Sequence, residues 1–201
     1  MKTIYAPVTA ATLLLALGGC NQKSEKSVDN VVNVTEETAT DLGNAASNAL
    51  SAAVDAVTPT PTGQEFADKA ARSDAFEIAA AKLALDNAAS PKVKSFAHEM
   101  IAAHTASTEK IKAAAKRATA AITPDATLTD GEKTRLEGLG KLKGADFDTS
   151  YLAGQVDAHK AALALMKDYA KHGDVASLKD AATAIVPIVQ KHLDKAKELK
   201  G

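Results

Sequence analysis

The sequence predicts an all-α protein built around a four-helix bundle. Apolar residues recur every three or four positions through four long segments after residue 63, which is the spacing of one helix face. No stretch alternates apolar and polar residues over the length of a typical strand. Aromatic residues make up only 3% of the chain, so the core must come mainly from Ala, Leu, Ile and Val. An Ala-rich chain of this kind favours closely packed helices.

The first 19 residues have the pattern of a secretory signal. Lys2 precedes a short apolar run that is too short for a typical membrane span. The run ends in "LGGC", which resembles the lipobox of bacterial lipoproteins and implies cleavage before Cys20 and acylation of that residue. Asn21 resembles the sorting pattern of outer-membrane lipoproteins in enteric bacteria. We therefore expect a lipid-anchored envelope protein at the periplasmic face of the outer membrane.

Residues 20–63 are predicted to form a tether between the lipid anchor and the folded domain of residues 64–201. The segment is rich in Asn, Thr, Ser, Val and Ala and ends in "TPTPTG". A weak apolar repeat over 28–57 indicates a fluctuating helix, with a coiled-coil or wall-facing element as the alternative. The net charge of −1 gives no reason to expect nucleic acid as a partner, and the sequence does not indicate a protein partner.

The first two long helices are predicted from about 64 to 89 and from 91 to about 121. Ser90 suits the N-cap of the second helix, and Pro91 suits its first turn. The inward faces are expected to carry Phe66, Ala70, Glu77, Ala81, Ala84 and Leu85 in the first helix and Val93, Phe96, Ala97, Met100, His104 and Ile111 in the second.

A short helix is predicted next, because Thr129 and Glu132 have the spacing of a capping box and the apolar pattern ends near Leu142. Gly144 is expected to break it, and the third long helix is predicted over 147–172. Its inward face is expected to carry Tyr151, Leu152, Gln155, His159, Ala162, Met166 and Tyr169.

The fourth long helix is predicted to follow a stop at Gly173 in the left-handed conformation, with Asp174 as its N-cap. Pro187 inside it should kink the helix or loosen one hydrogen bond. Its inward face is expected to carry Leu178, Ala181, Ile185, Ile188, His192, Ala196 and Leu199.

Each long helix places one possible metal ligand on its apolar face, namely Glu77, His104, His159 and His192. At about 1.5 Å of rise per residue, the first three lie at similar heights and His192 lies about one turn away. Such a set suits one Zn, Fe, Mn or Cu ion. The Glu-x-x-His pairs of a di-iron site are absent, because Ile101, Val156 and Val189 stand three residues before the histidines.

A purely structural network explains the same residues without a metal. Glu77 would then hold His104 or His159, and Gln155 would pair with another ring, since buried histidines need hydrogen-bond partners. We favour this interpretation at the level of sequence. Tyr151 and Met100 are expected to support the polar centre.

Three segments resemble one known family when they are taken in order. They are "FADKAARSDAFEIAAAKLALDNAASPKVKSFAHEMIAAHTAS", "FDTSYLAGQVDAHKAAL" and "IVPIVQKHLDKAKEL", and they span most of residues 64–200. They are similar to the bacterial envelope family called domain of unknown function 4142. The resemblance implies a ferritin-like fold and export to the envelope, with no established activity. It assigns the family's motif positions to Glu77, Met100, His104, Tyr151, Gln155, His159, Pro187 and His192.

Two functions follow from the sequence. We favour a lipid-anchored, non-enzymatic envelope module with a role in stress. The alternative is a metal-binding or redox protein with a mononuclear site of three histidines and Glu77. The sequence leaves open whether the protein is an enzyme, and we favour the non-enzymatic interpretation.

Overall fold

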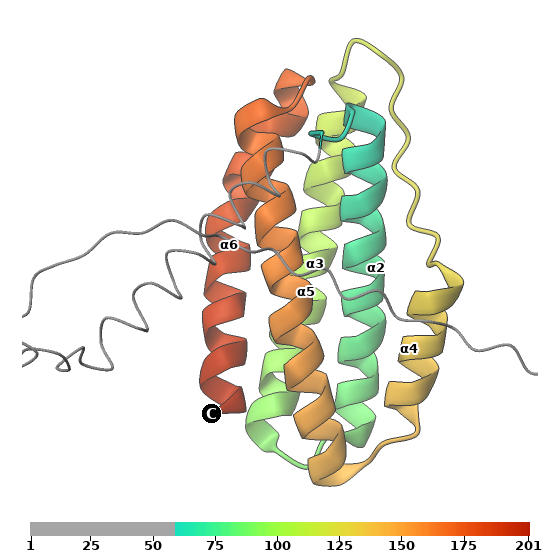
Figure 1. Cartoon of the computed structure of the whole chain (residues 1–201), viewed down its shortest axis with the longest axis vertical. Coiled ribbons are helices and arrows are strands. Elements are labelled where there is room, and N and C mark those ends of the chain that lie inside the picture. Colours follow the sequence, from blue (N-terminus) through green and yellow to red (C-terminus); the bar gives the residue numbers. More distant parts are fainter. Residues whose placement is uncertain (1–58) are drawn as a thin grey trace, which may run out of the picture. The chain divides into compact units, whose positions relative to one another are not determined.

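The computed structural model describes residues 59–201, and within this range it contains five helices and no strand (Figure 1). The four long helices pack side by side: α2 (Gly63–Asn87), α3 (Pro91–Lys116), α5 (Gly144–His172) and α6 (Ala176–Lys200). The short helix α4 (Asp130–Gly140) lies beside α2. This confirms the predicted four-helix bundle with a short helix between the second and third long ones. The predicted signal, Cys20 and nearly all of the tether lie outside the described residues, and the division at residue 63 stays a prediction.

The bundle contains one long crossover connection (Figure 1). The α2–α3 and α5–α6 pairs are antiparallel, are joined by short turns and make the most extensive contacts in the bundle. The segment 117–143, which includes α4, returns along the length of the bundle, so α3 and α5 run parallel. A single crossover is characteristic of ferritin-like bundles.

Side-chain caps fix three helix starts. At α2, Thr62 and Glu65 form a capping box, in which each side chain accepts a hydrogen bond from the other residue's backbone N–H. The predicted box of Thr129 and Glu132 at the start of α4 is confirmed. Ser90 caps α3 as predicted, by accepting a hydrogen bond from the backbone of Val93.

The second long helix is shorter than predicted, because it ends at Lys116 and not near Ala121. The chain beyond it is held along α2 by three side chains that are one turn apart. Gln64 bonds both backbone groups of residue 123, Asp68 accepts from the N–H of residue 125, and Arg72 donates to the carbonyl of residue 127. These tertiary contacts outweigh the helix propensity of the Ala-rich segment.

The third long helix begins earlier than predicted, at Gly144 and not at Phe147. Gly144 has a φ of 64°, in the left-handed region that glycine adopts without strain. The turn between α2 and α3 is fastened to this end of α5, because Asp148 accepts hydrogen bonds from the backbone N–H groups of Ala89 and Ser90.

Two predictions at the start of α6 were wrong. Gly173 is not left-handed, since its φ is −55°. It is instead a point of close approach, where an added Cβ would lie 2.6 Å from Cε1 of Tyr169. Asp174 does not cap α6, because its Oδ1 accepts a hydrogen bond of 2.8 Å from the Tyr169 hydroxyl and Val175 occupies the N-cap without a side-chain bond.

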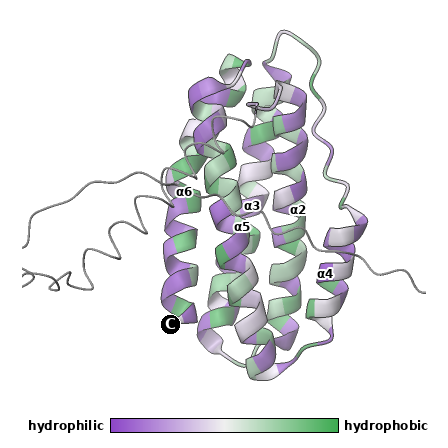
Figure 2. Cartoon of the chain, in the orientation of Figure 1, coloured by the Kyte–Doolittle hydropathy of each residue, from purple (hydrophilic) through white to green (hydrophobic). Residues whose placement is uncertain are grey.

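The core lies between the four long helices, and most residues predicted to face inward are buried there. Figure 2 shows hydrophobic and hydrophilic residues alternating around each long helix, as amphipathic helices require. The Phe66 and Tyr169 rings stack at one end with centroids 3.9 Å apart. Leu85, Ala162 and Leu199 are half-buried, and Ile188 is 42% exposed while Ile185 and Val189 take the inward positions on α6. Within residues 59–201, no helix is long and apolar enough to cross a membrane.

Candidate metal centre

Three buried histidines from three different helices meet in the middle of the bundle. The ring centroids of His104 and His159 are 5.6 Å apart, those of His159 and His192 are 5.5 Å apart, and those of His104 and His192 are 6.0 Å apart. One possible ligand atom from each residue lies within 4.8 Å of the other two. His192 is therefore level with the other rings, and the offset of one turn expected from helix rise is absent.

His104 is oriented by an aspartate on α2. Its Nδ1 lies 2.8 Å from Oδ1 of Asp74, and Oδ2 of Asp74 accepts a hydrogen bond of 3.0 Å from Thr108. Asp74 is 4% exposed, so its negative charge is buried and held by both donors from α3. Nδ1–H of His104 donates to this carboxylate, so in the neutral ring the lone pair is on Nε2.

His159 is oriented by its own helix. Its Nδ1 donates to the backbone carbonyl of Gln155 one turn earlier, over 2.9 Å. The proton on Nδ1 again leaves a lone pair on Nε2. Histidine ligands in metal sites almost always donate their second ring nitrogen to a carboxylate or a backbone carbonyl. His104 and His159 have these two kinds of partner.

Each of the three rings keeps one buried nitrogen without a hydrogen-bond partner: Nε2 of His104, Nε2 of His159 and Nδ1 of His192. A buried polar atom that lacks a partner costs about 1–3 kcal/mol of stability. Three such atoms in adjacent rings indicate one shared partner that accepts three lone pairs. A cation is such a partner, and no hydrogen bond joins these three nitrogens to one another.

The pKa values of His159 and His192 fit this role, whereas that of His104 is shifted in the other direction. Burial, with the positive charge of His104 nearby, lowers the pKa of His159 to about 4. Burial and His104 likewise lower the pKa of His192 to about 4. For His104, burial lowers the pKa, but the hydrogen bond to Asp74 and the charges of Glu77 and Asp74 outweigh it, and the net shift is upward. At neutral pH, His159 and His192 are therefore uncharged and have free lone pairs.

Glu77 lies beside the three histidines and outside their group of possible ligand atoms. Its carboxylate accepts a hydrogen bond from the Gln155 side chain. Burial raises the pKa of Glu77 although His104 and Gln155 act to lower it. Three further buried atoms have no hydrogen-bond partner: Glu77 Oε1, Gln155 Oε1 and the Tyr151 hydroxyl oxygen. Burial and the charge of Glu77 raise the pKa of Tyr151. Met100 is fully buried in the core.

The predicted structural network therefore has different partners from those expected. Glu77 was expected to hold a histidine, but Asp74 holds His104 and Glu77 pairs with Gln155. Gln155 was expected to bond a ring through its side chain, but its backbone carbonyl accepts from His159. Asp74 was missed as a site residue. Its signal in the sequence was its position one turn before Glu77 on the same helix face.

Replacing Glu77 with glutamine is expected to stabilise the metal-free bundle at neutral pH by about 1–3 kcal/mol, because it removes a buried charge and keeps an acceptor for Gln155. The pKa of Glu77 is raised in the fold, so its carboxyl favours folding most below the unfolded value of 4.5 and loses that contribution as the pH rises through the folded value. The gain from Glu77→Gln should therefore vanish near pH 4.5.

Urea denaturation of both proteins across this pH range measures the effect. Glu137→Gln on α4 is a matched control, because that carboxylate is exposed. A gain that is the same at pH 4.5 and pH 7 would contradict the assignment.

Among curated proteins, no sequence matches this chain significantly. Three solved structures share its fold. A fragment described as DUF305 from Deinococcus radiodurans has a TM-score of 0.61 at 16% identity and covers 71% of this chain and 97% of its own. CopM in a Cu(I)-bound form has a TM-score of 0.56 at 16% identity, covering 69% of this chain and 94% of its own. CopM in a Cu(II)-bound form has a TM-score of 0.57 at 17% identity, covering 71% and 97%.

At these identities the solved structures show a common fold and no more. The family comparison is more specific, because a family model matches residues 44–199 and so covers most of the chain. The match begins inside the segment predicted as a tether and extends through all four long helices. The protein belongs to the family described as domain of unknown function (DUF4142).

Proposed function

We propose that the bundle binds one transition-metal ion through the ring nitrogens of His104, His159 and His192. The observation that carries this proposal is the set of three buried nitrogens without partners in adjacent rings. Three atoms within 4.8 Å of one another have a common centre within about 2.8 Å of each, while metal–imidazole bonds measure about 2.0–2.1 Å. Ring rotations that move each nitrogen by less than about 1 Å would complete the site.

The surroundings supply the charge and the orientation that such a site needs. Asp74 and the Gln155 carbonyl hold the second nitrogen of two rings. Glu77 places a second carboxyl near the same rings, and its charge acts on His104. Two buried carboxyl groups beside three imidazoles offset the charge of a divalent ion, which lowers the cost of burying that ion.

Copper is the first metal to test. Three imidazoles without a carboxylate ligand suit Cu and Zn better than Mn, which prefers oxygen. Divalent copper also binds nitrogen sites more tightly than the other first-row divalent ions. The fold shared with CopM, whose two structures are described as Cu(I)-bound and Cu(II)-bound, supports the same choice. Zinc and iron are the alternatives.

The test uses the full chain and, beside it, residues 64–201. Both are purified without a histidine tag and stripped of metal by a chelator. We expect one copper per chain by elemental analysis after reconstitution, with affinity measured by competition against a chromophoric chelator. The control is His98→Ala, which removes an exposed histidine from α3 and should leave one copper bound. A wild-type protein that takes up no copper, zinc or iron would refute the proposal and leave the non-enzymatic module as the function.

Asparagine in place of Asp74 is expected to weaken copper binding about 10–100-fold while all three ligands remain, because the partner of a ligating histidine fixes its tautomer and orientation. An amide can also donate its N–H to Nδ1, which favours the tautomer that carries its proton on Nε2 and has no lone pair there. Competition titrations of wild type and Asp74→Asn measure the change. Asp68→Asn on the same helix removes a partly buried carboxylate that bonds only loop and α2 groups, so it should leave affinity unchanged.

We also propose that Cys20 anchors the protein to the outer membrane, on the support of the "LGGC" sequence and Asn21. Two or more acyl chains would make the attachment stable. In a bacterial host, the wild type is expected in the membrane fraction and labelled by a fatty-acid analogue. Cys20→Ala should be unlabelled and soluble. Equal labelling and equal membrane recovery of the two proteins would contradict the anchor.

A further inference from the structure

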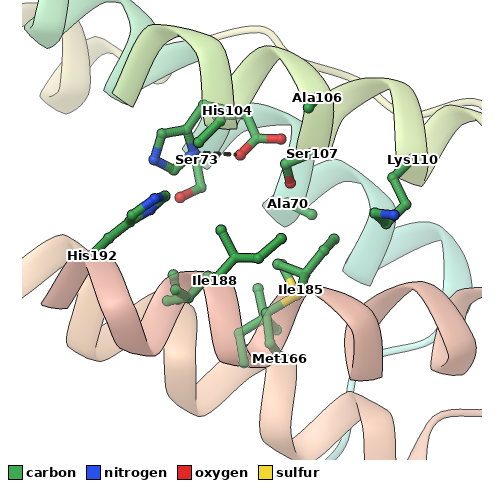
Figure 3. Close-up of a pocket in the computed structure, with 15 residues that line it drawn as sticks. Ala70, Ser73, His104, Ala106, Ser107, Lys110, Met166, Ile185, Ile188 and His192 are labelled. Carbon is green, nitrogen blue, oxygen red and sulfur yellow. Dashed lines mark hydrogen bonds and ion pairs between the residues drawn. The ribbon is translucent and has the colours of Figure 1, made fainter. Parts of the chain in front are cut away.

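A cavity adjoins two of the three histidines, His104 and His192. It has a volume of about 120 Å³ and lies lengthwise between α3 and α6, with α2 and α5 forming its floor. Figure 3 shows His104 and His192 at one end and Lys110 at the other. The cavity therefore runs from two histidines of the proposed metal site toward the exposed Lys110.

The walls of this cavity are mostly apolar. Its apolar lining consists of Ala70, Ala103, Ala106, Ala162, Leu165, Met166, Ile185, Ile188 and Val189. Ile188 is the exposed large hydrophobic residue noted above, and with the exposed Lys110 it lies on the cavity's outer side. The one carboxylate in the lining, Asp74, is already bonded to His104 and Thr108. Moving an anion into such walls is unfavourable, so an uncharged occupant is preferred.

The volume is suited to a small molecule. An apolar cavity of about 150 Å³ holds benzene or xenon in another protein and excludes water. Four alanines line this cavity where longer aliphatic side chains would fill it. The sequence therefore keeps unfilled space next to His104 and His192.

We infer that the cavity admits a small uncharged molecule to the ion held by the three histidines, so that the ion keeps one exchangeable coordination position. This inference rests on the proposed metal site. Structural zinc sites are closed by four protein ligands, whereas catalytic zinc sites have three protein ligands and one open position, and we apply the same reasoning to this site. Here three imidazoles come from the protein, and the cavity reaches His104 and His192 at its inner end. A diatomic gas is the simplest ligand of this class.

The test uses the metal-binding protein loaded anaerobically with one Cu(I) per chain, with carbon monoxide as the probe. We expect one carbon monoxide per copper, seen as a single infrared band of the Cu(I)–CO stretch. Ala70→Leu places a larger side chain in the cavity and should weaken carbon monoxide binding at least tenfold while copper affinity changes by less than about threefold. Ser107→Leu, on α3, is a second variant with the same expected result if Ala70→Leu does not fold.

Ala75→Leu is the matched control, because Ala75 lies on α2 outside the cavity lining. Xenon binding to the metal-free protein, followed through methyl signals of Ile185 and Val189, tests the cavity without copper. Copper binding without a carbon monoxide band would overturn the inference and leave the proposed function intact. A band unaffected by both filling variants would overturn the role of the cavity. Failure to bind copper at all would refute the proposed function, and the inference with it.

Discussion

Alanine in place of His159 is expected to lower the affinity of the bundle for copper by at least about a hundredfold. Changing a partner of a ligand already costs about 10–100-fold, and removing the ligand itself should cost more. His159 is 1% exposed, and its ring is fixed by the Gln155 carbonyl. Another ligand could take its place only if the surrounding core side chains moved. Only two imidazole ligands would then bind the ion, and the third protein ligand would be lost.

Competition titration against a chromophoric chelator measures this loss, and His98→Ala is again the control. His159→Ala also leaves a hole in the core, so folding must be checked by circular dichroism and urea denaturation of the metal-free proteins. His159→Phe fills most of the hole and should lose copper to the same extent. Wild-type affinity in a folded His159→Phe protein would exclude this residue as a ligand.

Acidification from pH 6.5 to pH 4 is expected to destabilise the metal-free bundle, by about 3 kcal/mol for each of His159 and His192 considered alone. Their pKa values fall to about 4 in the fold, against 6.5 in the unfolded chain. The unfolded state therefore binds more protons throughout this window, and stability falls as the pH falls. The loss begins near pH 6.5 and is complete below about pH 4. The two contributions will not add fully, because the rings are in contact.

Urea denaturation at a series of pH values gives the curve. His192→Phe should remove a large part of the acid loss, since phenylalanine cannot take up a proton. Glu77 acts in the opposite direction over part of the same range, so Glu77→Gln should make the acid loss steeper. Bound copper should suppress the loss until protons displace it, because coordinated nitrogens cannot be protonated. A stability curve for His192→Phe that is parallel to the wild type would contradict the assignment.

Much of the fold could be predicted from the sequence, because its signals are local. The capping box of Thr129 and Glu132 and the Ser90–Pro91 start each act within one helix turn, and both lie where predicted. Two of the errors are at positions where side-chain contacts outside the helix pattern decide. Side chains of α2 hold the loop after Lys116, and Tyr169 takes both the Asp174 carboxylate and the space beside Gly173.

The candidate site, too, could be predicted from the sequence only in part. Helical periodicity by itself put His104, His159 and His192 on the inward faces of three helices, because burial of one face follows from spacing. It could not choose between Asp74 and Glu77 as the partner of His104, since both lie on one face of α2 within one turn. That choice depends on helix rotation and rotamers, which the packing of all four helices sets together. The tertiary structure alone decided that Asp74 bonds His104 and that the three rings lie within about 6.0 Å of one another.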